Sequence, residues 1–170
     1  PFNLTALQTE AYRLFGITPS RTLQIAQSLY LGGLISYPRT SSQKLPLSIE
    51  YKETLKKLSK KYGVEDLITR SKPVEGPKSD PAHPSIYPTG ENYNAELDGE
   101  EARIYDLIVR RFISLFCDDA VIDKKVIKGE VDGLKFSLRG SSVRKKGWLE
   151  VYPVKMEEKN IPDAEGEFKI

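Results

Sequence analysis

The sequence is poor in the residues that usually build disulfides and soft-metal sites. It has one cysteine, Cys117, and one histidine, His83, among 170 residues. A single cysteine excludes an internal disulfide and a cysteine-based zinc site within the chain. A reducing, intracellular compartment is therefore the simplest interpretation. No run of about 18 apolar residues occurs, which excludes a helix that crosses a membrane.

An excess of charge of either sign is also lacking, because the formal net charge is only +2. Overall charge therefore says little about a nucleic-acid partner, and any such case must rest on local groups. Hydrophobic residues make up 39% and charged residues 29%, which predicts a soluble globular protein. The first residues form neither a signal peptide nor an initiator methionine, so we expect the chain to be a fragment of a longer polypeptide.

Hydrophobic periodicity predicts an α+β chain that changes character near residue 118. Helices are expected over residues 5–15, 19–31, 49–62 and 98–117, and a shorter one over 64–70, with a brief strand at 34–36. The expected helix starts are a T-x-x-Q capping box at residues 5–8, Thr18 before Pro19, Ser48, and a D-x-x-E box at residues 98–101. Residues 71–97 are rich in proline and glycine and predict a long loop, a kind of segment that is often functional.

After residue 118 the pattern is typical of strands. Strands are expected around residue 121 and over 125–127, 134–138 and 148–152, with Asp132-Gly133 as a hairpin turn and Trp148 buried in the sheet. The last residues, 166–168, predict a turn into a further strand. We therefore expect two units, a helical domain over residues 1–118 and β-rich material over 119–170.

One segment carries residue types suited to chemistry on a phosphodiester. Tyr37 offers a phenolic oxygen that is a competent nucleophile once deprotonated. Arg39 stands two residues later and could make paired hydrogen bonds to phosphate oxygens, and Thr40 and Ser41 add hydroxyls. The chain has nine tyrosines, most of which should be packing residues, so this signal alone is weak.

The longer pattern around this segment resembles a known family. Residues 25–30 read IAQSLY and residues 35–40 read ISYPRT, which resembles the active-tyrosine region of type IA DNA topoisomerases. PFNLTALQ at residues 1–8 is similar to the start of that domain, and AHPSIYPT at residues 82–89 is similar to the family's histidine motif. The segment over 140–153 more weakly resembles the return to the neighbouring arch domain. Ser41, Pro84 and Tyr87 depart from the bacterial pattern and resemble the archaeal branch.

The resemblance implies a winged-helix-like (CAP-like) tyrosine domain followed by part of the arch domain. It implies that Tyr37 attacks single-stranded DNA to form a 5′-phosphotyrosine, after which a strand passes and the break is religated. Arg39 would stabilise phosphoryl charge and His83 would orient the phosphate. The implied DNA contacts are Gln8, Ser20, Arg21, Thr40 and Ser41.

The resemblance also sets expectations for cofactor, partners and location. Magnesium would be bound in the parent enzyme by a carboxylate domain outside this chain, so we expect no metal ligand here and no cleavage by the fragment alone. The expected partners are single-stranded DNA and the missing domains of the same polypeptide. The expected location is cytoplasmic, in association with the nucleoid.

Three other interpretations remain open from the residues. The chain could be a DNA-binding module without catalysis that uses the lysines of residues 52–61 as a phosphate patch. It could be a tyrosine recombinase, although that class needs several arginines and histidines around its nucleophile and one histidine is present. It could also be a purely structural fragment in which Tyr37 packs in the core.

Overall fold

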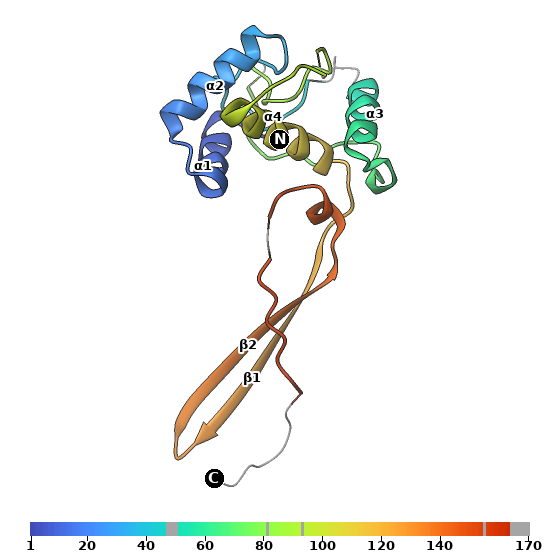
Figure 1. The fold of residues 1–170 in the computed structure, drawn as a ribbon. Coiled ribbons are helices and arrows are strands. Elements are labelled where there is room, and N and C mark those ends of the chain that lie inside the picture. Colours follow the sequence, from blue (N-terminus) through green and yellow to red (C-terminus); the bar gives the residue numbers. More distant parts are fainter. Residues whose placement is uncertain (47–50, 81, 93, 155, 164–170) are drawn as a thin grey trace.

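The computed structural model describes residues 1–46, 51–80, 82–92, 94–154 and 156–163. Four α-helices gather at one end, and a long two-stranded hairpin extends away from them (Figure 1). The helices are α1 (Leu4–Phe15), α2 (Pro19–Leu31), α3 (Tyr51–Tyr62) and α4 (Gly99–Ser114). Two short 3-10 turns accompany them, η1 (Glu65–Leu67) and η2 (Gly147–Glu150). The predicted mixture of helices and an antiparallel hairpin is confirmed. The winged-helix-like arrangement and the boundary near residue 118 stay predictions.

α4 lies at the centre of the helical part, between α1 and α2 on one side and α3 on the other (Figure 1). Its buried apolar face supplies Ile104, Leu107, Ile108 and Ile113, each no more than 1% exposed. Burial of one such side chain stabilises the fold by about 1.5–3 kcal/mol. The predicted stripe on α2 is also confirmed, because residues 22, 25, 26 and 29 are all buried.

Short-range cap signals set some helix ends and not others. Thr18 caps α2 as predicted, since its side chain accepts from the backbone N–H of Arg21. The predicted capping box at residues 5–8 is wrong, because α1 begins one residue after Asn3, whose side chain accepts from Ala6 N at 2.9 Å. Asp98 does precede α4 but makes no side-chain cap hydrogen bond. The predicted start at Ser48 lies outside the described residues.

The hairpin pairs β1 (Val121–Val131) with β2 (Leu134–Lys145) in antiparallel register. Val131 and Leu134 face each other across Asp132 and Gly133, whose φ values are +49° and +78°. Two successive left-handed residues fit the type I′ turn that suits twisted strands, so the predicted turn is confirmed. Near the other end of the hairpin, Ser141 forms an isolated bridge with Lys159 of the returning chain.

Three predicted elements differ from the structure. Residues 148–152 do not form a strand, because Gly147 reverses the chain at a φ of +52° and Trp148 N then donates to Asp118 O at 2.9 Å. Trp148 is accordingly half-buried in η2, beside Tyr152, rather than in a sheet. The strand expected at 34–36 is reduced to one isolated bridge at Ile35, and the helix expected at 64–70 to η1. The strand expected at 166–168 lies outside the described residues.

Candidate active site

The segment that carries Tyr37 leaves the end of α2 through a sharp reversal. Gly33 has a φ of +73°, a left-handed conformation that glycine adopts without strain. The reversal sends Leu34 and Ile35 into the core, where they are 5% and 1% exposed. Ile35 then forms an isolated bridge with Pro88 in the long loop over residues 71–97. The two segments that carry the tyrosine and histidine motifs are therefore neighbours.

Ser36 joins these two segments through three hydrogen bonds. Its backbone N–H donates to Tyr87 O at 2.9 Å, and its hydroxyl accepts from Tyr87 N at 3.0 Å. The same hydroxyl donates to Ser85 O at 3.0 Å. Because Tyr37 follows Ser36 directly, this pairing fixes the position of the tyrosine backbone relative to the histidine loop.

Tyr37 and His83 lie side by side, with ring centroids 5.8 Å apart. The Tyr37 side chain also meets the ring of Tyr30 from α2 edge-on, at 5.3 Å between centroids. Tyr37 is 38% exposed, so it is not packed in the core as the structural interpretation supposed. By contrast, burial raises the pKa of Tyr105 to about 12. The Tyr105 hydroxyl is therefore rarely ionised at neutral pH, which makes this buried tyrosine a poor candidate for the nucleophile.

Arg39 is exposed and is held from α2 by Gln27. With its amide oriented to satisfy its partners, Gln27 accepts from Arg39 Nη2 at 3.2 Å and from Arg39 Nε at 3.1 Å. A guanidinium has five N–H donors, so others remain available for a phosphate oxygen. The guanidinium stands on the same segment as Tyr37, two positions after it.

Thr40 links the tyrosine segment to the backbone of His83 by a hydrogen bond. Its hydroxyl donates to His83 O at 2.7 Å and accepts from Ser42 N at 3.0 Å. Thr40 is only 7% exposed, so its hydroxyl is engaged inside the protein, while its role as a DNA contact stays a prediction. The neighbouring Ser41 is exposed, and its carbonyl accepts from Asn3 Nδ2 at 3.3 Å.

The other predicted DNA contacts gather at the opposite end of α2. Gln8 Nε2 donates to Pro19 O at 2.9 Å, and Ser20 is exposed on the first turn. Arg21 is paired with Glu100, with 2.7 Å between Nε and Oε2. Since α2 rises by roughly 18 Å over its length, Gln8, Ser20 and Arg21 form a second group, separate from the tyrosine. A DNA role for this group stays a prediction.

Several contacts of the site involve residues that sequence reasoning did not single out. Gln27 and Tyr30 lie one helical turn apart on α2 and touch Arg39 and Tyr37, respectively. Their i, i+3 spacing before the tyrosine segment was a usable signal. Asp80 contacts His83 and also lies three residues before it.

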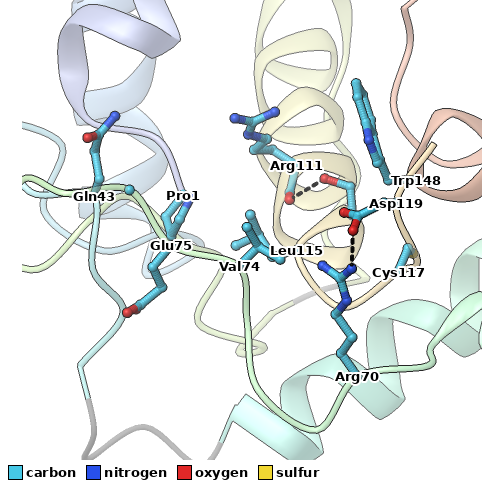
Figure 2. A pocket seen from close by; sticks show the side chains of 12 residues that line it. Pro1, Gln43, Arg70, Val74, Glu75, Arg111, Leu115, Cys117, Asp119 and Trp148 are labelled. Atoms are coloured by element: carbon cyan, nitrogen blue, oxygen red, sulfur yellow. Dashed lines mark hydrogen bonds and ion pairs between the residues drawn. The ribbon is translucent and has the colours of Figure 1, made fainter. Parts of the chain in front are cut away.

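A separate cavity of about 330 Å³ lies between α4, η2 and the loop around Glu75 (Figure 2). Arg70 and Asp119 form an ion pair at its wall, with 2.9 Å between Nη2 and Oδ2. Tyr37 and His83 do not line this cavity, so it is no part of the tyrosine site.

Across the described part of the chain, no group of three or more His, Cys, Asp or Glu side chains is arranged to hold a metal ion. No described helix is long and apolar enough to cross a membrane.

Comparisons with known proteins agree with these motifs. A family model described as DNA topoisomerase matches residues 1–169. DNA topoisomerase 1 of Methanothermobacter thermautotrophicus is 49% identical, over 98% of this chain and 24% of its own length. The same enzyme of Pyrococcus horikoshii is 45% identical, over 96% of this chain and 25% of its own. A solved structure of full-length topoisomerase I from Thermotoga maritima matches with a TM-score of 0.72 and 25% identity, over 98% of this chain and 29% of that one.

These matches, together with the tyrosine and histidine motifs, define the class of protein: the chain belongs to the type IA DNA topoisomerase family. The strong similarity to archaeal relatives agrees with the archaeal features expected from the sequence. The chain spans about a quarter of the length of the curated relatives it matches.

Proposed function

We propose that this chain supplies the nucleophile with which a type IA DNA topoisomerase breaks and reseals one DNA strand. Tyr37 loses its phenolic proton, and its oxygen attacks a backbone phosphorus, forms the O–P bond of a 5′-phosphotyrosine and expels the 3′ oxygen, which takes up a proton. A second strand passes through the gap. The 3′ hydroxyl then attacks the phosphotyrosine, reseals the backbone and releases Tyr37.

The observation that carries the proposal is the pairing of Tyr37 with His83, whose ring centroids lie 5.8 Å apart although the residues are 46 positions apart in sequence. An imidazole beside an accessible phenol is placed to donate a hydrogen bond to the phosphate under attack. Arg39 would supply fixed positive charge as the phosphoryl oxygens gain charge. Loss of a donor of this kind typically lowers the rate about 10²–10³-fold.

The proposal places magnesium outside this chain. When bound to the complete enzyme, the ion would help to neutralise charge on the phosphoryl group. Among the described residues no three acidic side chains are gathered to hold a metal ion, and some are engaged in ion pairs, such as Asp118 with Lys145 and Glu100 with Arg21. We propose that the chain alone therefore does not relax DNA. Magnesium-dependent relaxation by the isolated chain at a rate close to that of the complete polypeptide would refute this part.

The test uses the complete polypeptide that contains this chain and a single-stranded oligonucleotide. Denaturation during turnover should trap a protein–DNA adduct that retains a 3′ label and loses a 5′ label, because the tyrosine holds the 5′ phosphate of the downstream piece. Tyr37→Phe should abolish the adduct. Tyr30→Phe is the matched control, since Tyr30 is a neighbouring tyrosine that is 42% exposed.

Each alternative interpretation makes a different prediction in this assay. A DNA-binding module without catalysis gives no adduct in any variant. A tyrosine recombinase would retain the 5′ label instead, because that class links to the 3′ phosphate. Adduct formation that survives Tyr37→Phe would exclude Tyr37 as the nucleophile.

A further inference from the structure

Asp80 contacts His83 through both of its carboxylate oxygens. Oδ1 accepts from the backbone N–H groups of Ala82 at 3.0 Å and of His83 at 3.3 Å. Oδ2 lies 3.3 Å from Nδ1 of the His83 ring. The hydrogen bond from Ala82, followed by the contacts with His83, holds the pKa of Asp80 below its usual range, so the side chain is an anion at neutral pH. One carboxylate thus contacts both the backbone N–H groups of Ala82 and His83 and the ring of His83.

This contact decides which nitrogen of the imidazole carries hydrogen. An ionised carboxylate only accepts, so the Nδ1 atom that faces Asp80 must be the protonated one. The tautomer of a histidine is set by the hydrogen bond that one of its nitrogens makes. Nε2 is then the nitrogen left for a phosphate, and it donates to that phosphate when the ring is an imidazolium. Among the described residues, the titratable groups in contact with the ring are Asp80 and Tyr37.

His83 is held at two points, its backbone carbonyl and its ring. Thr40 from the tyrosine segment donates to the His83 carbonyl at 2.7 Å, and Asp80 from the loop holds Nδ1. The side chains of His83 and Asp80 are 50% and 30% exposed, so the pair is open to water and ligand. A half-exposed side chain would otherwise sample several rotamers. Asp80 restricts that freedom next to Tyr37.

We infer that Asp80 is a positioning residue, which keeps hydrogen on Nδ1 of His83 in both charge states of the ring and so leaves Nε2 for the phosphate under attack by Tyr37, to which it donates as an imidazolium. The inference about the tautomer rests on the contacts alone, and the inference about catalysis rests on the proposed function. Asp80 itself does not touch the reacting atoms; it acts through the imidazole.

The first test reads the tautomer directly. His83 is the only histidine of the chain, so a long-range ¹H–¹⁵N spectrum of this chain contains one imidazole. Above about pH 8, where the ring of a typical histidine is neutral, we expect the Nδ1–H form to dominate. Asp80→Asn should shift the ring toward Nε2–H, because an amide N–H can donate to Nδ1. Asp66→Asn is the control, since Asp66 is exposed in η1 and carries the same charge.

The unaltered chain decides this test even if the loop rearranges in the variant. A neutral ring that is mainly Nε2–H would overturn the inference. So would the same tautomer ratio in Asp80→Asn and Asp66→Asn.

The second test measures adduct formation by the complete polypeptide at saturating single-stranded DNA. Asp80→Asn should slow the cleavage step about fivefold, the scale expected for a half-exposed pair, with little change in the DNA concentration that half-saturates the enzyme. Asp66→Asn should match the unaltered enzyme. Equal rates in the two variants, with Tyr37→Phe inactive, would overturn the role of Asp80 and leave the proposed function intact. Adduct formation by Tyr37→Phe would instead refute the proposed function.

Discussion

Replacement of Thr40 by valine tests the contact that holds the tyrosine and histidine segments together. Valine keeps the shape and the β-branch of threonine but removes the hydroxyl that donates to His83 O and accepts from Ser42 N. The His83 residue is exposed, so water can replace the lost donor, and this bond contributes about 1 kcal/mol. Ser42 is 0% exposed, so its N–H would be left without a partner at a cost of about 1–3 kcal/mol.

The structure therefore predicts that Thr40→Val lowers the free energy of unfolding by about 2–4 kcal/mol. For a chain of this length the midpoint of thermal unfolding should fall by roughly 4–16 °C. Urea unfolding followed by far-UV circular dichroism measures the change, which should appear as a lower midpoint with an unchanged slope. Thr5→Val is the control, because Thr5 is exposed on α1. A loss for Thr40→Val within about 0.5 kcal/mol of that control would refute the reasoning.

Two further substitutions test the fold around the site. Gly147→Ala should destabilise the chain by about 1–3 kcal/mol in the same urea assay, because its φ is +52° and an added Cβ would lie 2.5 Å from Asp118 O; an unchanged midpoint would contradict this. Arg13→Gln should raise the lowered pKa of Glu10, whose first cause is the Arg13 hydrogen bond. Because the pKa of Glu10 is lower in the folded chain than its unfolded value of 4.5, the pair stabilises the fold above that value. The deficit of this variant should therefore be full at pH 7, shrink as the pH falls below 4.5 and vanish once the pH has fallen through the lowered pKa of folded Glu10. A deficit independent of pH would contradict it.

Local features of this fold could be predicted from the sequence where neighbouring residues decide the conformation. Thr18 before Pro19 and the Asp132-Gly133 turn are such cases, because a cap or a tight turn is set within a few residues. The prediction of a strand over residues 148–152 was wrong, because the apolar residues there fit a strand pattern. In the structure the left-handed conformation of Gly147 and the hydrogen bond from Trp148 N to Asp118 O produce a 3-10 turn instead. Long-range packing overrode the local pattern there.

The candidate site was less accessible to sequence reasoning than the fold. Residue chemistry alone gave no reason to bring His83 to Tyr37, and only the family resemblance linked the two motifs. The contact between them depends on Ser36, whose hydroxyl and backbone N–H bond the backbone of the histidine loop, and no local sequence pattern indicates these long-range partners. Asp80, which contacts the His83 ring, and Gln27, which contacts the Arg39 guanidinium, were not singled out from the sequence; for Gln27 the i, i+3 spacing with Tyr30 was a usable signal, whereas the contact of Asp80 became evident only in the structure.

The most direct measurement of the central claim identifies the atom that becomes bonded to DNA. The trapped adduct of the complete polypeptide can be digested with nuclease and protease and analysed by tandem mass spectrometry. We predict a nucleotide 5′-phosphate on the peptide that contains Tyr37, with fragment ions that assign it to that residue. A nucleotide on Tyr30 or on any other residue, with Tyr37 unmodified, would contradict the account.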